Sequence, residues 1–269
     1  MNSTQLQKKA QWVRLEVLDA IVKSGKSHIG GTYSAVDLLV ALYYGNFLKK
    51  GDRFILSKGH ACTALYAIFL DLGKISKKMY NSYGKDGGLG GQLEMWLPGV
   101  DFNTGSMGHA IGVAAGMAMA ARMSAGGGSA SGGNLSKAVT MIGDAELFEG
   151  SCWEAIIFAG QIALGNLVVI VDRNRLSVTD VIEDDSVYKD FEKKIESFGW
   201  RHEQIDGHDF GDIQRAFKKI RTSKQPTMII ADTIKGKGVS FMENNVQWHN
   251  AMPSGEQIKA ARTELYGHS

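Results

Sequence analysis

Proline and cysteine are scarce in this chain, and it has neither a long apolar run nor a strong charge imbalance. The 269 residues include three prolines and two cysteines, Cys62 and Cys152. Two cysteines cannot build a disulfide framework, so we expect a reducing, cytoplasmic setting in which both thiols are buried and inert. No apolar run reaches membrane-spanning length and no signal peptide is evident, so no membrane association is expected. The net charge of +2 does not point to nucleic acid as a partner.

Glycine, in contrast, is abundant, with 33 residues that fall mostly in loops. The Gly/Ser-rich segment at about 124–136 predicts a flexible surface connection. The length suits one hydrophobic core, so residues 1–269 are expected to form a single domain.

Apolar periodicity predicts an α/β fold, with a mostly parallel sheet covered by helices on both faces. Helices are predicted at about 4–24, 34–47, 61–72, 76–82, 108–124, 149–164, 187–198, 210–222 and 254–265. Strands are predicted at about 138–142, 167–172, 201–205 and 227–232, where short β-rich runs end at turn residues.

Two polar side chains follow two of the predicted strands directly. Asp144 comes after the run that ends at Ile142, and Asn174 comes after the run from Leu167 to Val171. Parallel strands with a crossover helix would place both side chains at the carboxyl edge of the sheet, where such sheets bind ligands. A carboxylate and an amide oxygen suit a divalent cation that completes its shell with phosphate oxygens. The alternative is purely structural, with Asp144 as a helix N-cap and Asn174 as a turn residue.

Further short motifs accompany this pair in a fixed order. They are Ser24-Gly25-Lys26-Ser27-His28-Ile29-Gly30-Gly31, Asp52-Arg53-Phe54-Ile55-Leu56-Ser57-Lys58-Gly59-His60-Ala61, Leu97-Pro98-Gly99-Val100, Thr104-Gly105-Ser106-Met107-Gly108-His109-Ala110, Lys235-Gly236-Lys237-Gly238-Val239 and Trp248-His249-Asn250. In this order the set resembles the N-terminal half of transketolase, from about residue 10 to residue 265. The resemblance is strongest to the small N-terminal chain of the split form, in which transketolase is divided between two polypeptides.

The resemblance implies a thiamine-diphosphate-binding fold, with thiamine diphosphate and Mg²⁺ (or Ca²⁺ or Mn²⁺) as cofactors. In the family, the positions of Asp144, Asn174 and the carbonyl of Leu176 hold the metal, and Asp172 matches a position at the metal loop. The family positions that contact the cofactor correspond here to His60, Gly105, Met107, Asp144, Ala145, Glu149, Asn174 and His249.

Three histidines and one glutamate match catalytic positions of the family. His28, His60 and His249 would line the substrate channel, where an imidazole can move protons to and from sugar hydroxyls. Glu149 would face its counterpart across a dimer axis, in an acidic network that links two active sites. Taken alone, each histidine would more commonly cap a helix or pack in the interior, and Glu149 would stabilise a helix N-terminus.

The chain departs from the family at one substrate-binding position. Gln92 stands where a histidine usually contacts the ketose donor, beside His28 and His249 in the expected substrate site. An amide cannot carry a proton charge at neutral pH, which argues against the family's usual sugar-phosphate donor and favours a modified sugar or a specialised pathway.

No second α/β unit follows the Trp248-His249 element. The resemblance therefore implies that the partner is a separate C-terminal transketolase subunit, in a heterotetramer of two chains of each kind. Two alternatives stay open: another thiamine-diphosphate-dependent carbon–carbon bond enzyme, such as a 2-oxo acid dehydrogenase E1 or an acyloin-forming enzyme, or a non-catalytic chain that keeps the fold.

Overall fold

The structure is a computed structural model, and it describes residues 1–125, 135–178, 180–182, 187–221 and 223–267. Its sheet has five strands in the order β1-β2-β3-β5-β4, and all neighbouring strands are parallel. The strands are β1 (Arg53–Leu56), β2 (Ala138–Gly143), β3 (Leu167–Arg173), β4 (Arg201–Asp206) and β5 (Thr227–Asp232). The predicted α/β class with a parallel sheet is confirmed.

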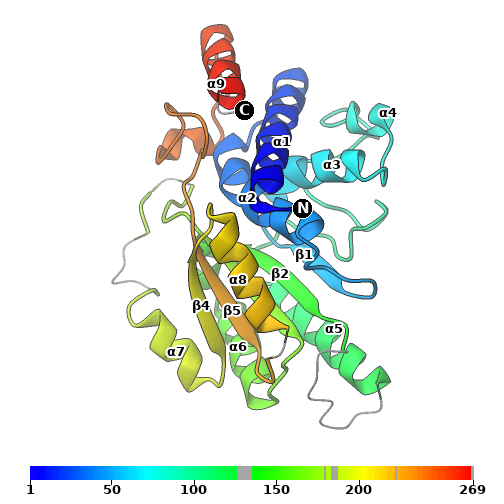
Figure 1. Cartoon of the computed structure of the whole chain (residues 1–269), viewed down its shortest axis with the longest axis vertical. Coiled ribbons are helices and arrows are strands. Elements are labelled where there is room, and N and C mark those ends of the chain that lie inside the picture. Colours follow the sequence, from blue (N-terminus) through cyan, green and yellow to red (C-terminus); the bar gives the residue numbers. More distant parts are fainter. Residues whose placement is uncertain (126–134, 179, 183–186, 222, 268–269) are drawn as a thin grey trace.

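Helices cover both faces of this sheet (Figure 1). They are α1 (Ser3–Ser24), α2 (Ile29–Tyr44), α3 (Cys62–Asp71), α4 (Lys77–Tyr80), α5 (Ala110–Ser124), α6 (Gly150–Gln161), α7 (Phe191–Ser197), α8 (Phe210–Ile220) and α9 (Gly255–Gly267). Short 3₁₀ turns occur at Gly59–Ala61, Asp144–Phe148 and Val246–His249. Within the part of the chain that is described, no helix is both long and apolar enough to cross a bilayer.

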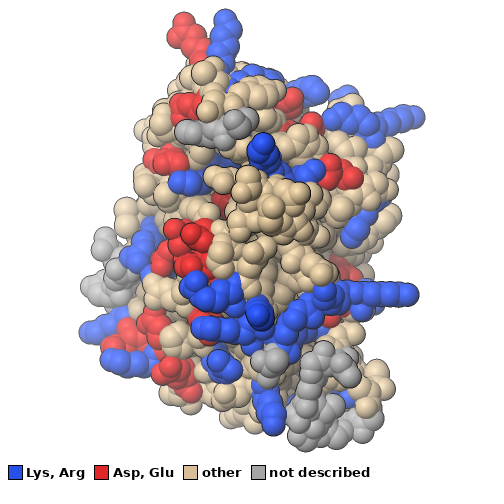
Figure 2. Space-filling view, viewed as in Figure 1, with Lys and Arg blue, Asp and Glu red and all other residues tan. Residues whose placement is uncertain are grey.

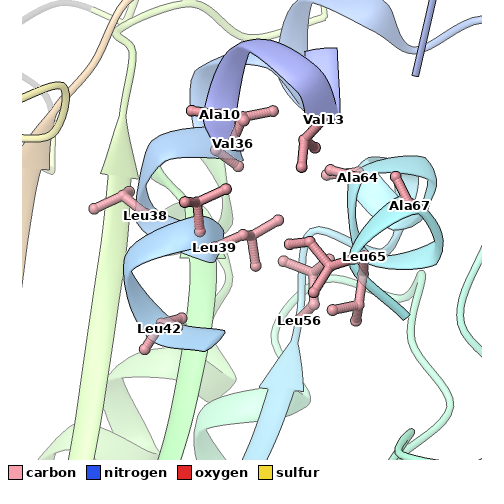
Figure 3. Packing of buried hydrophobic residues seen from close by; sticks show 14 of the residues in the cluster. Ala10, Val13, Val36, Leu38, Leu39, Leu42, Leu56, Ala64, Leu65 and Ala67 are labelled. Atoms are coloured by element: carbon pink, nitrogen blue, oxygen red, sulfur yellow. The ribbon is translucent and has the colours of Figure 1, made fainter. Parts of the chain in front are cut away.

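Strand alternation divides the interior into two cores. On β3, Val168 and Ile170 face the core formed with α1, α2, α3 and α8, whereas Val169 and Val171 face the core formed with α5, α6 and α7. Figure 3 shows the first core, in which Leu39 of α2 lies between α1, α3 and the end of β1. Both faces of the central strands β2, β3 and β5 are therefore buried, which explains why their sequences are mostly apolar, whereas the edge strand β4 is polar and largely exposed.

Helix α8 is the clearest amphipathic element. Ile213 and Phe217 are buried against the sheet, whereas Arg215 and Lys218 face solvent. Figure 2 shows the face of the molecule on which α8 lies. Lys and Arg side chains gather across its lower half, with acidic groups beside them. The mixed signs are those of an ordinary solvated surface.

Three element predictions were wrong in detail. Strand β1 was missed, because four residues are too few to show a period. Helix α2 begins at Ile29, before the predicted start at Ser34, and α7 begins at Phe191, after the predicted start at 187. Most of the segment predicted as a flexible connection lies outside the described residues. Cys62 and Cys152 are free and buried, as predicted.

Gly30 and Gly31 misled the prediction of α2, because two adjacent glycines usually indicate a loop. Here they allow close approach inside a helix. A Cβ added at Gly30 would lie 2.8 Å from the Trp248 carbonyl oxygen, and one at Gly31 would lie 2.8 Å from His60 Nε2. Real Cβ atoms do not come that close, so glycine lets α2 carry His28 up to the other two histidines.

Candidate active site at the carboxyl edge of the sheet

The two oxygen side chains predicted as metal ligands meet at the carboxyl edge of the sheet. Strands β2 and β3 are neighbours, with Gly143 opposite Asp172, so Asp144 and Asn174 leave the sheet side by side. The Asp144 carboxylate accepts hydrogen bonds from the main-chain N–H groups of Ala145 (2.8 Å) and Arg175 (2.5 Å). Asn174 Oδ1 accepts from the Leu176 N–H at 3.1 Å. The bond from the Arg175 N–H to Asp144 joins the loop after β3 to the loop after β2, and the other two bonds order each loop internally.

The Arg175 backbone shows how much the local geometry is constrained. Its φ is +62°, a left-handed conformation that is unfavourable for a residue with a Cβ. The bond from its N–H to Asp144 compensates for this cost and turns the chain so that Leu176 lines the cavity.

A cavity of about 270 Å³ lies over these loops. The predicted site residues that line it are His60, Gly105, Met107, Asp144, Ala145, Asn174, Leu176 and His249. The structure thus brings eight predicted residues from five separate segments to one place. Because these residues are far apart in the sequence, their meeting in one cavity supports the prediction that they form one site.

The chemistry of this cavity fits a divalent cation. Burial, reinforced by the nearby Asp172 carboxylate, raises the pKa of Asp144 to about 6. A cation beside Asp144 would reverse that shift and supply the missing opposite charge. No group of three or more His, Cys, Asp and Glu side chains in the described residues could hold a metal by itself. The donor set is a carboxylate, an amide and a main-chain carbonyl, which suits a hard cation completed by phosphate oxygens.

Two glycines with left-handed backbones lie in the segment that brings Gly105 and Met107 to the cavity wall. Gly105 and Gly108 have φ values of +127° and +89°, which favour glycine over any other residue. They lie in the turn that precedes α5, and Gly105 lines the cavity, where the lack of a side chain lets main-chain groups approach an anion. Met107, between them, is 52 % exposed.

The three predicted histidines form one cluster. The ring centroids of His28 and His60 are 5.6 Å apart, those of His28 and His249 are 5.7 Å apart, and those of His60 and His249 are 5.4 Å apart. Burial lowers the pKa of each, with neighbouring cations adding to the effect for His60 and His249, and the pKa of His249 falls to about 4. All three imidazoles are therefore neutral at pH 7.

Lys235 was not assigned a role from the sequence, yet it organises this cluster. Its side chain is almost fully buried, and its ammonium donates to the carbonyls of Ser177 (2.7 Å) and Leu176 (3.3 Å). The same ammonium lies 3.1 Å from His249 Nδ1, which must act as acceptor. The proton of neutral His249 is thereby placed on Nε2. Burial lowers the pKa of Lys235 to about 8. The sequence signal that could have indicated a role for Lys235 is its position in the glycine-rich segment Lys235-Gly236-Lys237-Gly238.

Asp172 is the penultimate residue of β3, opposite Gly143, and its carboxylate is close enough to raise the pKa of Asp144. The Asp172 carboxylate is buried and forms an ion pair with Lys58, and it also accepts from Ser34 Oγ at 2.7 Å and from the Thr233 hydroxyl. Asp172 lies inside β3 with its side chain 0 % exposed, whereas Asn174 comes directly after the strand and lines the cavity.

Gln92 and Glu149 lie beside the cavity rather than among its lining residues. A Cβ added at Gly59 would lie 2.1 Å from Gln92 Oε1, so the amide packs directly behind that glycine. Glu149 is half-buried and occupies the N-cap position of α6, next to the exposed Phe148. Its side chain also packs against Gly108.

The sequence and fold have clear relatives among known proteins. Residues 5–269 match the family described as transketolase, thiamine diphosphate binding domain. The chain is 36 % identical to one subunit of an apulose-4-phosphate transketolase of Phocaeicola vulgatus, over 94 % of this chain and 90 % of the relative. It is 34 % identical to a 6-deoxy-6-sulfo-D-fructose transketolase subunit, SqwG, of a Clostridium species, over 97 % of this chain and 96 % of the relative.

A solved transketolase from Campylobacter jejuni superposes with a TM-score of 0.88 at 29 % identity. The match covers 99 % of this chain but only 43 % of that one. The relatives named as subunits thus match over nearly their whole length, and the longer solved enzyme over less than half. The chain belongs to the transketolase family, as a thiamine diphosphate binding domain.

Proposed function

We propose that this chain is the diphosphate-binding subunit of a two-chain transketolase that uses thiamine diphosphate and Mg²⁺. The reaction would move a two-carbon ketol unit from a ketose, or its phosphate, to an aldose. One observation carries the proposal: Asp144 and Asn174 leave adjacent strands into the same cavity that His60 and His249 line. Metal ligands and proton carriers are therefore within reach of one cofactor.

Each residue can be given a task from its geometry. Asp144, Asn174 and the Leu176 carbonyl would hold the metal, and the turn at Gly105 would offer main-chain groups to the cofactor. Thiamine diphosphate supplies, when bound, a ring that stabilises the carbanion formed as the sugar's carbon–carbon bond breaks.

The histidines would handle the protons of the sugar hydroxyls. His60 and His28 are neutral at pH 7, so each can accept a hydroxyl proton. The Lys235 ammonium fixes His249 with its proton on Nε2, so that atom would donate to a substrate oxygen. Glu149, at the start of α6, would act from the boundary between subunits.

A companion chain would complete the site. The relatives named as transketolase subunits match over 90–96 % of their own length, and their names imply a second subunit. Met107, which lines the cavity, is 52 % exposed, and Phe148 and Phe158, just before and within α6, are 54 % and 43 % exposed. Apolar surface of this kind, next to an incomplete site, favours a protein partner. We propose a cytoplasmic heterotetramer of two chains of each kind, with Glu149 near its counterpart.

The substrate is proposed to be a modified sugar or its phosphate. Two relatives carry apulose-4-phosphate and 6-deoxy-6-sulfo-D-fructose in their names, and neither is an ordinary pentose phosphate. Gln92, which replaces a family histidine, supports the same direction.

The experiment reconstitutes the two chains and measures both ketol transfer and cofactor binding. The chain alone should show no transfer, and activity should appear when the companion is added with thiamine diphosphate and Mg²⁺. Asp144→Ala should weaken cofactor binding at least tenfold, which is about 1.4 kcal/mol, whereas the exposed Asp86→Ala should leave it unchanged. Full activity from this chain alone, or equal binding by Asp144→Ala, would refute the proposal. A 2-oxo acid tested as donor separates transketolase from an E1-type reaction.

A further inference from the structure

Glu146 connects three loops of the cavity and has no role in the function described so far. It lies in the 3₁₀ turn Asp144–Phe148 and is only 2 % exposed. Its Oε1 accepts a hydrogen bond from Ser57 Oγ at 2.5 Å and another from the Gly108 main-chain N–H at 2.9 Å. Ser57 follows β1, and Gly108 precedes α5, so the three partners are remote in sequence.

Each connected segment contributes to the cavity wall. The segment after β1 provides Lys58 and His60, the turn before α5 provides Gly105 and Met107, and the turn of Glu146 itself provides Asp144. One carboxyl oxygen therefore sets the separation between the metal ligand, a histidine and the glycine turn.

The Gly108 peptide is held from both sides. Its N–H donates to Glu146, and its carbonyl accepts from Ser151 Oγ at 3.0 Å. Gly108 has a positive φ, and an added Cβ would lie 2.4 Å from Ser151 Oγ, so this turn has no alternative residue and little room to move. Both holding groups come from the segment that begins at Asp144. The glycine turn is thus fastened to the segment that carries the metal ligand.

Burying a carboxyl group costs free energy unless its hydrogen bonds are made. The Ser57 hydroxyl and the Gly108 N–H supply bonds that a glutamine could equally accept, because an amide oxygen has the same position and two lone pairs. An alanine would leave the Gly108 N–H without an acceptor and open space between three loops. The glutamine variant therefore keeps the hydrogen-bond acceptor, and the alanine variant removes it.

We infer that Glu146 is a positioning residue, whose bonds to Ser57 and Gly108 hold the glycine turn and the histidine loop at the right distance from the metal ligands. The inference rests on the proposed function, since the distance matters for the diphosphate that spans the two sides. Glu146 acts through its neighbours and need not touch the cofactor.

The test compares Glu146→Ala, Glu146→Gln and the exposed control Glu256→Ala in the complex of this chain with its companion. The first readout is the dissociation constant of thiamine diphosphate at fixed Mg²⁺, by titration calorimetry. The second is hydrogen exchange of the Gly108 amide without cofactor. Glu146→Ala should bind thiamine diphosphate about tenfold more weakly, or about 1.4 kcal/mol, and exchange Gly108 faster. Glu146→Gln and Glu256→Ala should match the wild type in both.

Wild-type affinity in Glu146→Ala would overturn the inference, and so would Glu146→Gln binding as weakly as the alanine variant. If the alanine variant does not fold, Ser57→Ala removes one bond without opening a large space. It should weaken binding by a smaller factor, and unchanged binding would count against the inference. A wild-type complex that binds no thiamine diphosphate would refute the proposed function, while Gly108 exchange would still decide whether Glu146 fastens the turn.

Discussion

The ion pair between Lys58 and Asp172 is the most deeply buried charge interaction of the site. The side chains are 3 % and 0 % exposed. Lys58 also donates to the Gly31 carbonyl at 2.9 Å and to Ser34 Oγ at 3.3 Å. Replacing Lys58 with methionine keeps the stem of the side chain but leaves the Asp172 carboxylate in the interior with only hydroxyl donors.

The magnitude follows from this burial. Removing one partner of a buried pair costs about 3–5 kcal/mol, because an uncompensated charge remains. A typical domain has a total stability of about 5–15 kcal/mol, so Lys58→Met should consume a large part of it. Adding Asp172→Asn removes the stranded charge while the amide still accepts from Ser34. The double variant should therefore recover at least about 2 kcal/mol, so the two substitutions are strongly non-additive.

The assay is urea unfolding at pH 7, followed by far-ultraviolet circular dichroism, for both single variants and the double variant. The matched control is Lys77→Met, which breaks the pair with Glu16 at a lysine that is 55 % exposed. That change should cost under about 1 kcal/mol, because exposed pairs are screened by solvent. The reasoning fails if Lys58→Met costs no more than Lys77→Met, or if the effects at Lys58 and Asp172 simply add.

Three further outcomes are expected. Gly59→Ala should disrupt the cavity wall and lower the unfolding midpoint, because the new Cβ would meet Gln92 Oε1 at 2.1 Å, Thr104 Oγ1 at 2.6 Å and the Gly105 main-chain nitrogen at 3.1 Å. Gly116→Ala in α5, with nothing within 4 Å, should instead stabilise the isolated chain by about 0.5–1 kcal/mol. The folded pKa of His249, about 4, lies below the unfolded value of 6.5, so the unfolded state binds more protons between them. Stability should fall as pH drops from 7 towards 4, and urea midpoints at pH 7 and 5 should show a smaller drop for His249→Gln. In thermal melts of the two-chain complex, thiamine diphosphate at 100 times its dissociation constant should stabilise by about 2.7 kcal/mol at saturating Mg²⁺, and EDTA should remove that gain.

Local sequence signals were sufficient wherever one segment alone decides the structure. Strands β2 and β3 are mostly apolar and are followed directly by Asp144 and Asn174, so both their class and the placement of the two polar residues at the sheet edge were predictable. Strand β1 was not, because its four residues carry no period and its pairing with β2 depends on the rest of the sheet. The start of α2 was misjudged because Gly30 and Gly31 serve packing against Trp248 and His60, which no local pattern reveals.

Motif order in the sequence identified the family and predicted the metal-ligand pair and the three histidines, since each prediction depends on residue type and position along the chain. Only the tertiary structure showed which contacts hold these residues in place. The Lys235 ammonium at His249, the ion pair of Asp172 with Lys58 and the bonds of Glu146 to Ser57 and Gly108 all join residues remote in sequence. Such contacts arise when parallel strands bring their carboxyl ends to one edge, and they leave no periodic trace in the segments that make them.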